Sequence, residues 1–342
     1  MTHLPQERPG PAVCPPRCAP RSALTASDIL DDKHDDTVIL HNRILPAIVA
    51  QTLFRRQTYN MDTASLEPYR DVLHHQMTSG IIRDFSTNAT APADTFLRGL
   101  NLHRALQILD LGCGFGYMTA ELARMVSPDA CIIGMDACAE NEIPFTNAVA
   151  QAQRRSRFIC EQIEKRLPFG DNTFDVVFCS YALYFFVDII PDIARVLKET
   201  GCFIAVCHSI DFIDDMLNVA GLPMARQQMM KVFGAFNCEN GTQMLAPHFG
   251  RIGHVPYRNQ LRFKQENCDA LATYVIHKLP FIYPDKFGDE TIVQMVVHTV
   301  AATVARQGEI TIAKNDCCFR CTAPHSASRP KRNPQNHMKQ LS

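Results

Sequence analysis

Three glycines fall within five positions of a chain that has only 16 glycines in 342 residues. Gly112, Gly114 and Gly116 directly follow the apolar run QILDL and directly precede a segment with helical periodicity. Glycine at such a junction permits a turn with positive φ, and it lets a ligand approach backbone that carries no Cβ. The loop therefore predicts a strand, a ligand-binding turn and a helix in succession.

Short apolar runs alternate with amphipathic segments on both sides of this loop. The runs are rich in Ile, Val and Phe, which is typical of strands buried on both faces of a parallel sheet. They cover residues 107–111, 130–136, 157–163, 174–180 and 202–208. Helical patterns cover 118–125, 142–153 and 188–198, and Gly201 is placed to end the last of them. This alternation predicts an α/β fold with a doubly wound, Rossmann-like sheet.

The second half of the chain predicts a helical insertion and a late return to the sheet. Residues 212–253 read as the insertion, with helical character over 212–236 that is interrupted at Gly221 and Pro223. Later strands are expected at 254–264 and 309–321, and later helices at 268–278 and 290–306. The strand at 309–321 would complete the sheet.

Composition divides the chain into four parts. Residues 1–37 hold six prolines and an acidic run without apolar periodicity, so we expect this segment to be disordered. Residues 38–102 show a helical period, interrupted by Pro46, and predict a helical cap. Residues 103–323 contain the sheet, and 324–342 read as a disordered basic tail.

Charge and hydropathy exclude some partners. Lys plus Arg number 34 and Asp plus Glu 35, so no net field draws the protein to nucleic acid or anionic lipid. No apolar run approaches the ~18 residues that cross a bilayer, and the first twenty residues lack the apolar core of a secretory signal. We therefore expect a cytoplasmic protein without a membrane span.

The fourteen cysteines are expected to be mostly buried, reduced thiols. Cys317, Cys318 and Cys321 with His325 have the side chains of a zinc site. Neighbouring positions on a strand, however, point to opposite faces of the sheet. No metal is expected there.

The second predicted strand ends in Asp136, twenty residues after Gly116. A carboxylate at that tip can accept hydrogen bonds from both hydroxyls of a ribose, and it disfavours a 2′-phosphate. The glycines are spaced GxGxG and not GxGxxG, so the loop lacks the dinucleotide fingerprint. A nicotinamide-dependent oxidoreductase is therefore the weakest reading.

Three segments in this order, QILDLGCGFGYMTAEL, IIGMDA and LPFGDNTFDVVFCSYALYFF, resemble the class I S-adenosylmethionine-dependent methyltransferases over about residues 107–208. The resemblance implies S-adenosylmethionine as the cofactor and a late antiparallel strand in the sheet. It also implies positions for the cofactor. The pocket for its methionine part would be contacted or shaped by Asp110, Gly112, Gly114 and Gly116. Asp136 would hold its ribose, and Ala137 would border its adenine. Ser180 and Tyr181 would line the side that faces its methyl group.

Two further positions of the resemblance need comment. Cys113 lies within the loop and is counted with the cofactor-binding residues, although we interpret it as a small packing residue and not as a nucleophile. The family commonly has an acid near the adenine amine, a few residues before LPF. Ile163 occupies that offset here, so Glu161 or Gln162 takes the role only if the loop is one or two residues longer.

Methyl transfer from a sulfonium mainly requires in-line placement of the acceptor. A hydroxyl or acidic carbon would benefit from a general base, and His208, at the end of the fifth strand, is the catalytic candidate. The alternative is a histidine bonded to neighbouring backbone. His74 and His75 of the cap could face the site from above.

The sequence after the fourth strand, CSYALY, lacks the Asn-Pro-Pro-Tyr turn and the Pro-Cys pair of base methylation. A small-molecule acceptor is therefore favoured over nucleic acid. An apolar lid could enclose it, formed by Ile81, Ile82, Phe85, Met216, Met224, Met229 and Met230, although a methionine stripe is as often ordinary core.

The sequence thus predicts a methyltransferase that acts on a small organic acceptor by O-, N- or C-methylation. Two alternatives stay open: an RNA or protein methyltransferase that uses the basic tail, and a catalytically silent methyltransferase-like binding protein. The oligomeric state is not predicted.

Overall fold

The computed structural model describes residues 67–283 and 289–325. All of them belong to one compact unit, residues 52–342. The predicted disordered segment 1–37, the predicted cap up to residue 66 and the tail from residue 326 onward lie outside the described residues. Within the described ranges, no helix combines the length and the hydropathy needed to cross a membrane.

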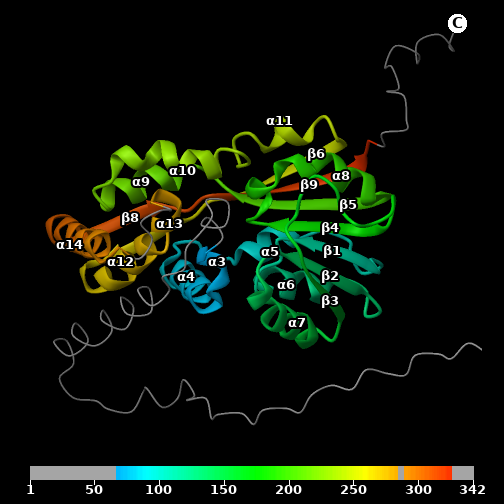
Figure 1. Cartoon of the computed structure of the whole chain (residues 1–342), viewed down its shortest axis with the longest axis horizontal. Helices are drawn as coiled ribbons and strands as arrows, with labels where there is room; N and C mark the ends of the chain where they lie inside the picture. Colours follow the sequence, from blue (N-terminus) through cyan, green and yellow to red (C-terminus); the bar gives the residue numbers. More distant parts are fainter. Residues whose placement is uncertain (1–66, 284–288, 326–342) are drawn as a thin grey trace, which may run out of the picture. The chain divides into compact units, whose positions relative to one another are not determined.

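A seven-stranded sheet forms the centre of the unit, in the order β3-β2-β1-β4-β5-β9-β6 (Figure 1). The first five of these strands are parallel to one another, and β9 is antiparallel to both β5 and β6. The predicted doubly wound sheet with a late antiparallel strand is confirmed. The strands are β1 (Gln107–Leu111), β2 (Cys131–Asp136), β3 (Arg155–Cys160), β4 (Phe174–Ser180), β5 (Leu197–His208), β6 (Phe249–Tyr257) and β9 (Asp316–Pro324).

Helices cover both faces of this sheet. On one face, α5 (Pro92–Leu97), α6 (Tyr117–Met125) and α7 (Glu142–Gln151) share a buried apolar core with Ile108, Val176 and Ile204 of the strands. The opposite face carries α11 (Gly241–Leu245), where Gly241 approaches the Phe319 ring of β9, and α8 (Ile190–Val196) packs against β5. Apolar side chains on both faces explain the near-continuous apolar runs of the sequence.

A second group of elements, which we call the cap, is built around a two-stranded sheet of β7 (Gln260–Lys264) and β8 (Glu309–Ala313) (Figure 1). Its helices contact one another and these two strands. They are α3 (Glu67–Arg70), α4 (Val72–Phe85), α9 (Asp211–Val219), α10 (Arg226–Phe233), α12 (Cys268–Ile276), α13 (Leu279–Ile282) and α14 (Glu290–Gln307). Short 3-10 helices cover Ala139–Asn141, Leu183–Phe185, Val187–Ile189, Pro223–Ala225 and Gln265–Asn267.

Two predicted strands are each divided between the two sheets. The run 254–264 splits into β6 and β7, and the run 309–321 splits into β8 and β9. The breaks lie side by side, because Asn259 N donates to Asn315 Oδ1 (2.9 Å) and Lys314 N donates to Asn259 O (3.0 Å). The Asn315 side chain thus replaces a backbone partner of the β-sheet hydrogen bonds, and both strands leave the main sheet at this point. Because β6 begins at Phe249, the predicted insertion 212–253 is not entirely helical.

Two other predicted boundaries were wrong. The helix expected over 188–198 ends at Val196, and Gly201 lies inside β5, where a Cβ would stand 2.8 Å from the Leu197 side chain. Glycine is needed there for close packing at a register shift between β4 and β5, not to end a helix. At the other end, Pro324 still belongs to β9, and His325 N donates to His248 O (2.8 Å). The ordered chain therefore extends beyond the predicted start of the tail.

Candidate functional site

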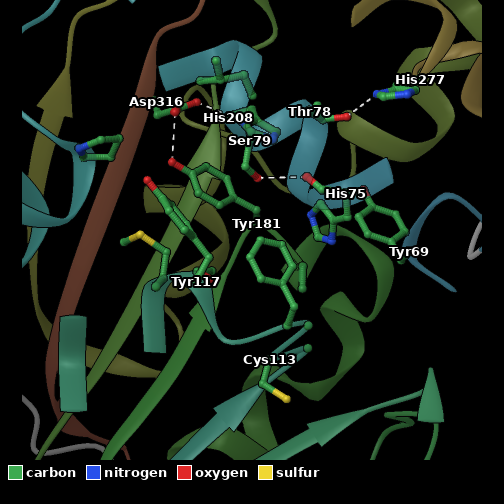
Figure 2. A pocket seen from close by; sticks show the side chains of 18 of the residues that line it. Tyr69, His75, Thr78, Ser79, Cys113, Tyr117, Tyr181, His208, His277 and Asp316 are labelled. Carbon is green, nitrogen blue, oxygen red and sulfur yellow. Dashed lines mark hydrogen bonds and ion pairs between the residues drawn. The ribbon is translucent and has the colours of Figure 1, made fainter. Parts of the chain in front are cut away.

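A cavity of about 500 Å³ opens at the carboxyl ends of β1, β2, β4 and β5. In doubly wound sheets, ligands bind at this edge. The loops after these strands form its floor, and α4 and the segment 276–281 of the cap line it from the other side (Figure 2). One continuous cavity thus joins the glycine loop to the cap.

The three glycines of the loop all have positive φ, but they serve different purposes. A Cβ on Gly112 would lie 2.4 Å from Ala182 Cβ, and one on Gly116 would lie 3.0 Å from Ala148 Cβ. Both positions therefore require glycine for packing. A Cβ on Gly114 would meet only the His75 ring, 3.8 Å away, at the edge of the cavity. Gly114 is the glycine that leaves room for a ligand.

Asp136 ends β2 and lines the cavity next to this loop. Its Oδ2 accepts from Gly114 N (2.8 Å), and its Oδ1 accepts from Cys138 N (2.9 Å) and Asn141 Nδ2 (3.2 Å). A carboxylate can accept about four hydrogen bonds, and these three contacts use three of them. One acceptor position of Asp136 therefore stays available. Asp136 therefore shapes the loop and can still accept from a ligand hydroxyl.

Asp110 lies beneath the loop and is fully buried. Its Oδ2 accepts from Thr119 Oγ1, whereas its Oδ1 has no hydrogen-bond partner among the described residues. Burial raises the pKa of Asp110 to about 7; the Thr119 hydrogen bond opposes this rise and the charge of Asp136 adds to it. The cost of an unpaired buried carboxylate favours the protonated acid.

The structure brings most of the predicted site residues to one cavity. The lining includes Gly112, Cys113, Gly114, Asp136, Ala137, Gln162, Ser180, Tyr181 and His208. Asp110, Gly116 and Glu161 are not among the lining residues; Asp110 is buried beneath the loop, whereas Glu161 is exposed. Between the two candidates before LPF, the geometry therefore favours Gln162, and Ile163 lines the cavity next to it. Cys113 is buried, and burial raises the pKa of its thiol, as suits a packing residue.

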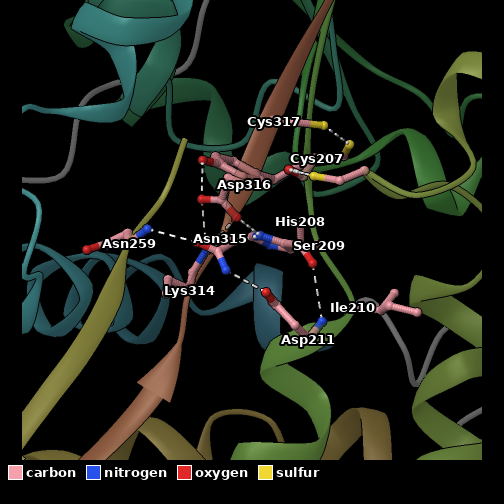
Figure 3. A network of polar contacts seen from close by, with 12 residues as sticks. Cys207, His208, Ser209, Ile210, Asp211, Asn259, Lys314, Asn315, Asp316 and Cys317 are labelled. Atoms are coloured by element: carbon pink, nitrogen blue, oxygen red, sulfur yellow. Dashed lines mark hydrogen bonds and ion pairs between the residues drawn. The ribbon is translucent and has the colours of Figure 1, made fainter. Parts of the chain in front are cut away.

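His208 belongs to a polar cluster at the cap side of the cavity, together with Tyr181, Lys314 and Asp316 (Figures 2 and 3). Asp316 Oδ1 lies 2.8 Å from His208 Nδ1, and its Oδ2 accepts from Tyr181 Oη (3.0 Å). The Lys314 ammonium donates to both oxygens, at 2.8 and 2.9 Å. The Tyr181 ring stacks on the imidazole at 4.5 Å. The imidazole therefore bonds to a side chain and not to neighbouring backbone, which was the alternative.

The charges of this cluster compensate one another. Burial, with a smaller contribution from the charge of Lys314, lowers the pKa of His208 to about 4 against the opposing effect of Asp316. Burial alone would raise the pKa of Asp316, but Lys314 and His208 hold it at about 2. The cluster is therefore a neutral imidazole beside a carboxylate–ammonium pair. Sequence reasoning missed Lys314 and Asp316, because nothing in the local pattern KND marks them.

The residues after β4 and on α4 complete the lining. Tyr181 has φ of 57°, a left-handed conformation that is costly for a bulky side chain and is typical of functional turns. His74 and His75 both line the cavity, as the sequence suggested. His75 packs edge-on against Phe115 of the glycine loop (4.9 Å), and its buried Nδ1 has no partner within the described chain. A buried, unpartnered nitrogen beside the loop suits a polar ligand.

The predicted apolar lid was largely wrong. Of its seven residues, only Ile82 lines the cavity. Met216 and Met229 are fully buried in the cap, and Met224 is 93% exposed. Phe85 stacks on Phe263 (4.6 Å). Hydrophobicity alone does not say which side of a helix faces a cavity, and here the methionines form ordinary core or surface.

These features suit an adenosyl sulfonium. Gly114 presents backbone without a side chain, Asp136 can accept from a ribose hydroxyl, and His75 offers an unpartnered nitrogen. Residues 108–201, which include the loop, Asp136 and Tyr181, match the family model described as a methyltransferase domain.

Curated relatives share this part of the chain. The uncharacterised methyltransferase YcgJ of Bacillus subtilis is 34% identical over 106 residues, 30% of this chain and 40% of that protein. A demethylmenaquinone methyltransferase of Lactococcus lactis is 34% identical over 106 residues, 30% of this chain and 41% of that protein. The human mitochondrial arginine-hydroxylase NDUFAF5 is 29% identical over 116 residues, 32% of this chain and 30% of that protein.

The chain thus matches about two fifths of the length of these two methyltransferases. The strand order, the glycine loop, the acid that ends β2 and the family model agree with one another. Together they support a class I S-adenosylmethionine-dependent methyltransferase domain that includes residues 108–201.

Proposed function

We propose that the protein transfers the methyl group of S-adenosylmethionine to a small organic acceptor. The observation that carries this proposal is the single cavity that extends from Gly114 and Asp136 to the cluster of His208, Tyr181, Lys314 and Asp316. The cofactor and the acceptor can therefore occupy neighbouring parts of one cavity, which is the requirement for in-line displacement.

In this proposal, the loop edge holds the cofactor. Gly114 gives its methionine part access to backbone, Asp136 accepts from its ribose, and Ala137 and Gln162 border its adenine. Ser180 and Tyr181 face the reacting end. When bound, the cofactor supplies a methyl group that is activated by the sulfonium charge. Asp110 and Gly116 support these residues from behind the lining.

His208 would serve acceptors that must lose a proton. We assign the imidazole proton to Nδ1, which then donates to Asp316 Oδ1 (2.8 Å), while the Lys314 ammonium, 3.1 Å from the same nitrogen, donates to the carboxylate. Nε2 is then the nitrogen that can take a proton from a hydroxyl, an amine or an acidic carbon. Asp316 fixes the tautomer, and Tyr181 holds the plane of the ring by stacking.

The cap favours a small acceptor. Side chains of α4 and of the segment 276–281 line the cavity opposite the glycine loop, so an acceptor would be surrounded on both sides. An RNA or protein acceptor was linked to the basic tail, most of which lies outside the described residues. The arginine-hydroxylase relative carries a different activity on a similar segment, so the test must detect methyl transfer itself.

A labelling experiment tests this proposal. The full-length protein is incubated with a whole-cell extract and methyl-labelled S-adenosylmethionine, and label is sought by mass spectrometry in the small-molecule, RNA and protein fractions. Asp136→Ala, which weakens the cofactor site, serves as the control. We expect a labelled small molecule that the variant does not form. Cofactor binding without any labelled product would favour the silent binding protein, and label in RNA or protein would favour the other alternative.

A further inference from the structure

Three cysteines from distant parts of the chain meet on the side of β5 and β9 that faces away from the cavity. Cys207 is the next-to-last residue of β5, Cys317 is the second residue of β9, and Cys238 follows α10. Their sulfur atoms all lie within 4.8 Å of one another, and the Sγ atoms of Cys207 and Cys317 are 3.5 Å apart (Figure 3). Cys207 and Cys317 are fully buried, and Cys238 is half-buried.

The backbone places these thiols together independently of any ligand. Cys207 and Cys317 are directly opposite in the antiparallel register of β5 and β9. Cys238 N donates to His208 O (3.0 Å), which attaches the third cysteine to the end of β5. Asn237 Oδ1 accepts from the backbone N–H of Glu239 and of Asn240, both at 3.0 Å, and so fixes the turn that carries Cys238.

His254 of β6 adds a fourth metal-binding group. It is paired with Phe319, two residues after Cys317 on β9, so alternation along the strand places both side chains on the face of Cys317. The His254 ring stacks on Phe319 at 5.2 Å. His254 is exposed, so an ion could reach the buried thiols from this side.

We propose that Cys207, Cys238, Cys317 and His254 bind one Zn²⁺ ion, at a site separate from the methyltransferase cavity. Three thiolates and one imidazole in tetrahedral geometry are a common structural zinc set. With Zn–S bonds of about 2.3 Å, the sulfurs of such a site are about 3.8 Å apart. The Sγ atoms of Cys207 and Cys317 are 3.5 Å apart and all three sulfur atoms lie within 4.8 Å of one another, so small side-chain rotations would bring the three thiolates to this spacing.

Binding would be a simple exchange of protons for metal. The thiol protons leave to solvent, three S–Zn bonds and one N–Zn bond form, and no electron is transferred. The ion would tie β5, β6, β9 and the Cys238 turn together directly behind His208 and Asp316.

Other cysteines of the chain provide the contrast. Cys318 follows Cys317 on β9 but points to the other face, where its thiol contacts Phe96 O of α5 (3.9 Å). In the described part of the chain, the Cys207–Cys238–Cys317 group is the one set of three potential ligands within mutual reach. Cys318 is therefore the matched control: it is equally buried and adjacent in sequence, but it lies on the wrong face.

The test measures metal content and needs no methyl acceptor. The full-length protein is purified under reducing conditions with zinc present. The bound zinc is then quantified by elemental mass spectrometry. We expect about one equivalent in the wild type and in Cys318→Ala, and background in Cys238→Ala. Cys238 is the principal target because it is half-buried on a turn; circular dichroism checks that each variant is folded. Zinc in Cys238→Ala at the wild-type level would overturn the proposal.

Cobalt substitution tests the ligand set. Co²⁺ added to the metal-free protein should give the thiolate-to-metal bands of a tetrahedral three-sulfur site, and His254→Ala should shift the d–d bands while keeping the thiolate bands. Unchanged d–d bands would remove His254 from the site. A Cys207–Cys317 disulfide, found by peptide mass spectrometry in protein purified with zinc, would show a redox pair instead and would also overturn the proposal.

Discussion

His208 and Asp316 lie 108 residues apart in the chain, yet their side chains meet at 2.8 Å, because the two residues are opposite each other where β5 pairs with β9. One residue earlier on β5 and one later on β9, the same register brings Cys207 and Cys317 together on the other face. The antiparallel addition of β9 thus forms the polar end of the cavity and the thiol cluster behind it.

His208→Gln is expected to lower turnover by about 10²- to 10⁴-fold for an acceptor that must lose a proton, because the variant lacks the accepting nitrogen. The affinity for S-adenosylmethionine should stay at the wild-type value, since the ring lies on the cap side of the cavity. Initial rates with labelled cofactor and binding calorimetry measure the two effects. His298→Ala, an exposed histidine of α14, is the control. Wild-type turnover in His208→Gln would exclude the base.

Asp136→Ala is expected to weaken cofactor binding by about 10- to 150-fold, because charge-assisted hydrogen bonds worth roughly 1.5–3 kcal/mol are lost. Part of this loss should come from the loop, since Gly114 N loses its acceptor as well. Asp129→Ala, in the exposed turn before β2, should bind the cofactor as the wild type does. Calorimetry decides between the two outcomes, and an unchanged dissociation constant for Asp136→Ala would remove this residue from the site.

The packing role of Gly112 and the ligand-access role of Gly114 can be distinguished by comparison with Gly99. Gly99 has φ of +77° and no described atom within 4 Å of an added Cβ. Gly99→Ala therefore measures backbone strain alone, about 1–2 kcal/mol. Gly112→Ala should cost about 1–3 kcal/mol more in the free energy of unfolding, because its Cβ would overlap Ala182. Gly114→Ala should resemble Gly99→Ala in stability but weaken cofactor binding. Denaturant unfolding and calorimetry measure both quantities, and equal stability of all three variants would contradict the packing assignment.

Asp110 should make the cofactor-free protein less stable as the pH rises from about 4 to about 7. Its pKa is about 7 in the folded protein and near 4 when unfolded, so in this window the folded state binds more protons and loses that advantage as the pH rises. Asp110→Asn does not titrate. Its unfolding temperature, relative to the wild type, should therefore increase through this window and level off above it. Thermal unfolding at several pH values measures the difference. A constant difference between Asp110→Asn and the wild type would be evidence against the raised pKa.

The sequence alone determined the parallel part of the sheet and the cofactor edge of the cavity. Strand, glycine turn, helix and terminal acid follow one another within thirty residues (107–136), and local backbone preferences with apolar periodicity are sufficient to specify them. Gly114 and Asp136 can therefore be predicted as site residues from the order of the residues, and Tyr181 from its place directly after the fourth strand. His208 can be proposed in the same way, because the end of a predicted parallel strand marks the ligand-binding edge.

The tertiary structure decided what lies opposite that edge. Asp316, Lys314 and the Cys238 turn reach their places through strand pairing and contacts between segments that are far apart in sequence, and such pairing leaves no local pattern. The division of 309–321 between two sheets depends on the contact between Asn259 and Asn315. The burial of Met216 and Met229 depends on which face of α9 and of α10 packs against the rest of the cap. Local periodicity specifies an element and its apolar side, but only long-range packing determines which neighbour that side will face.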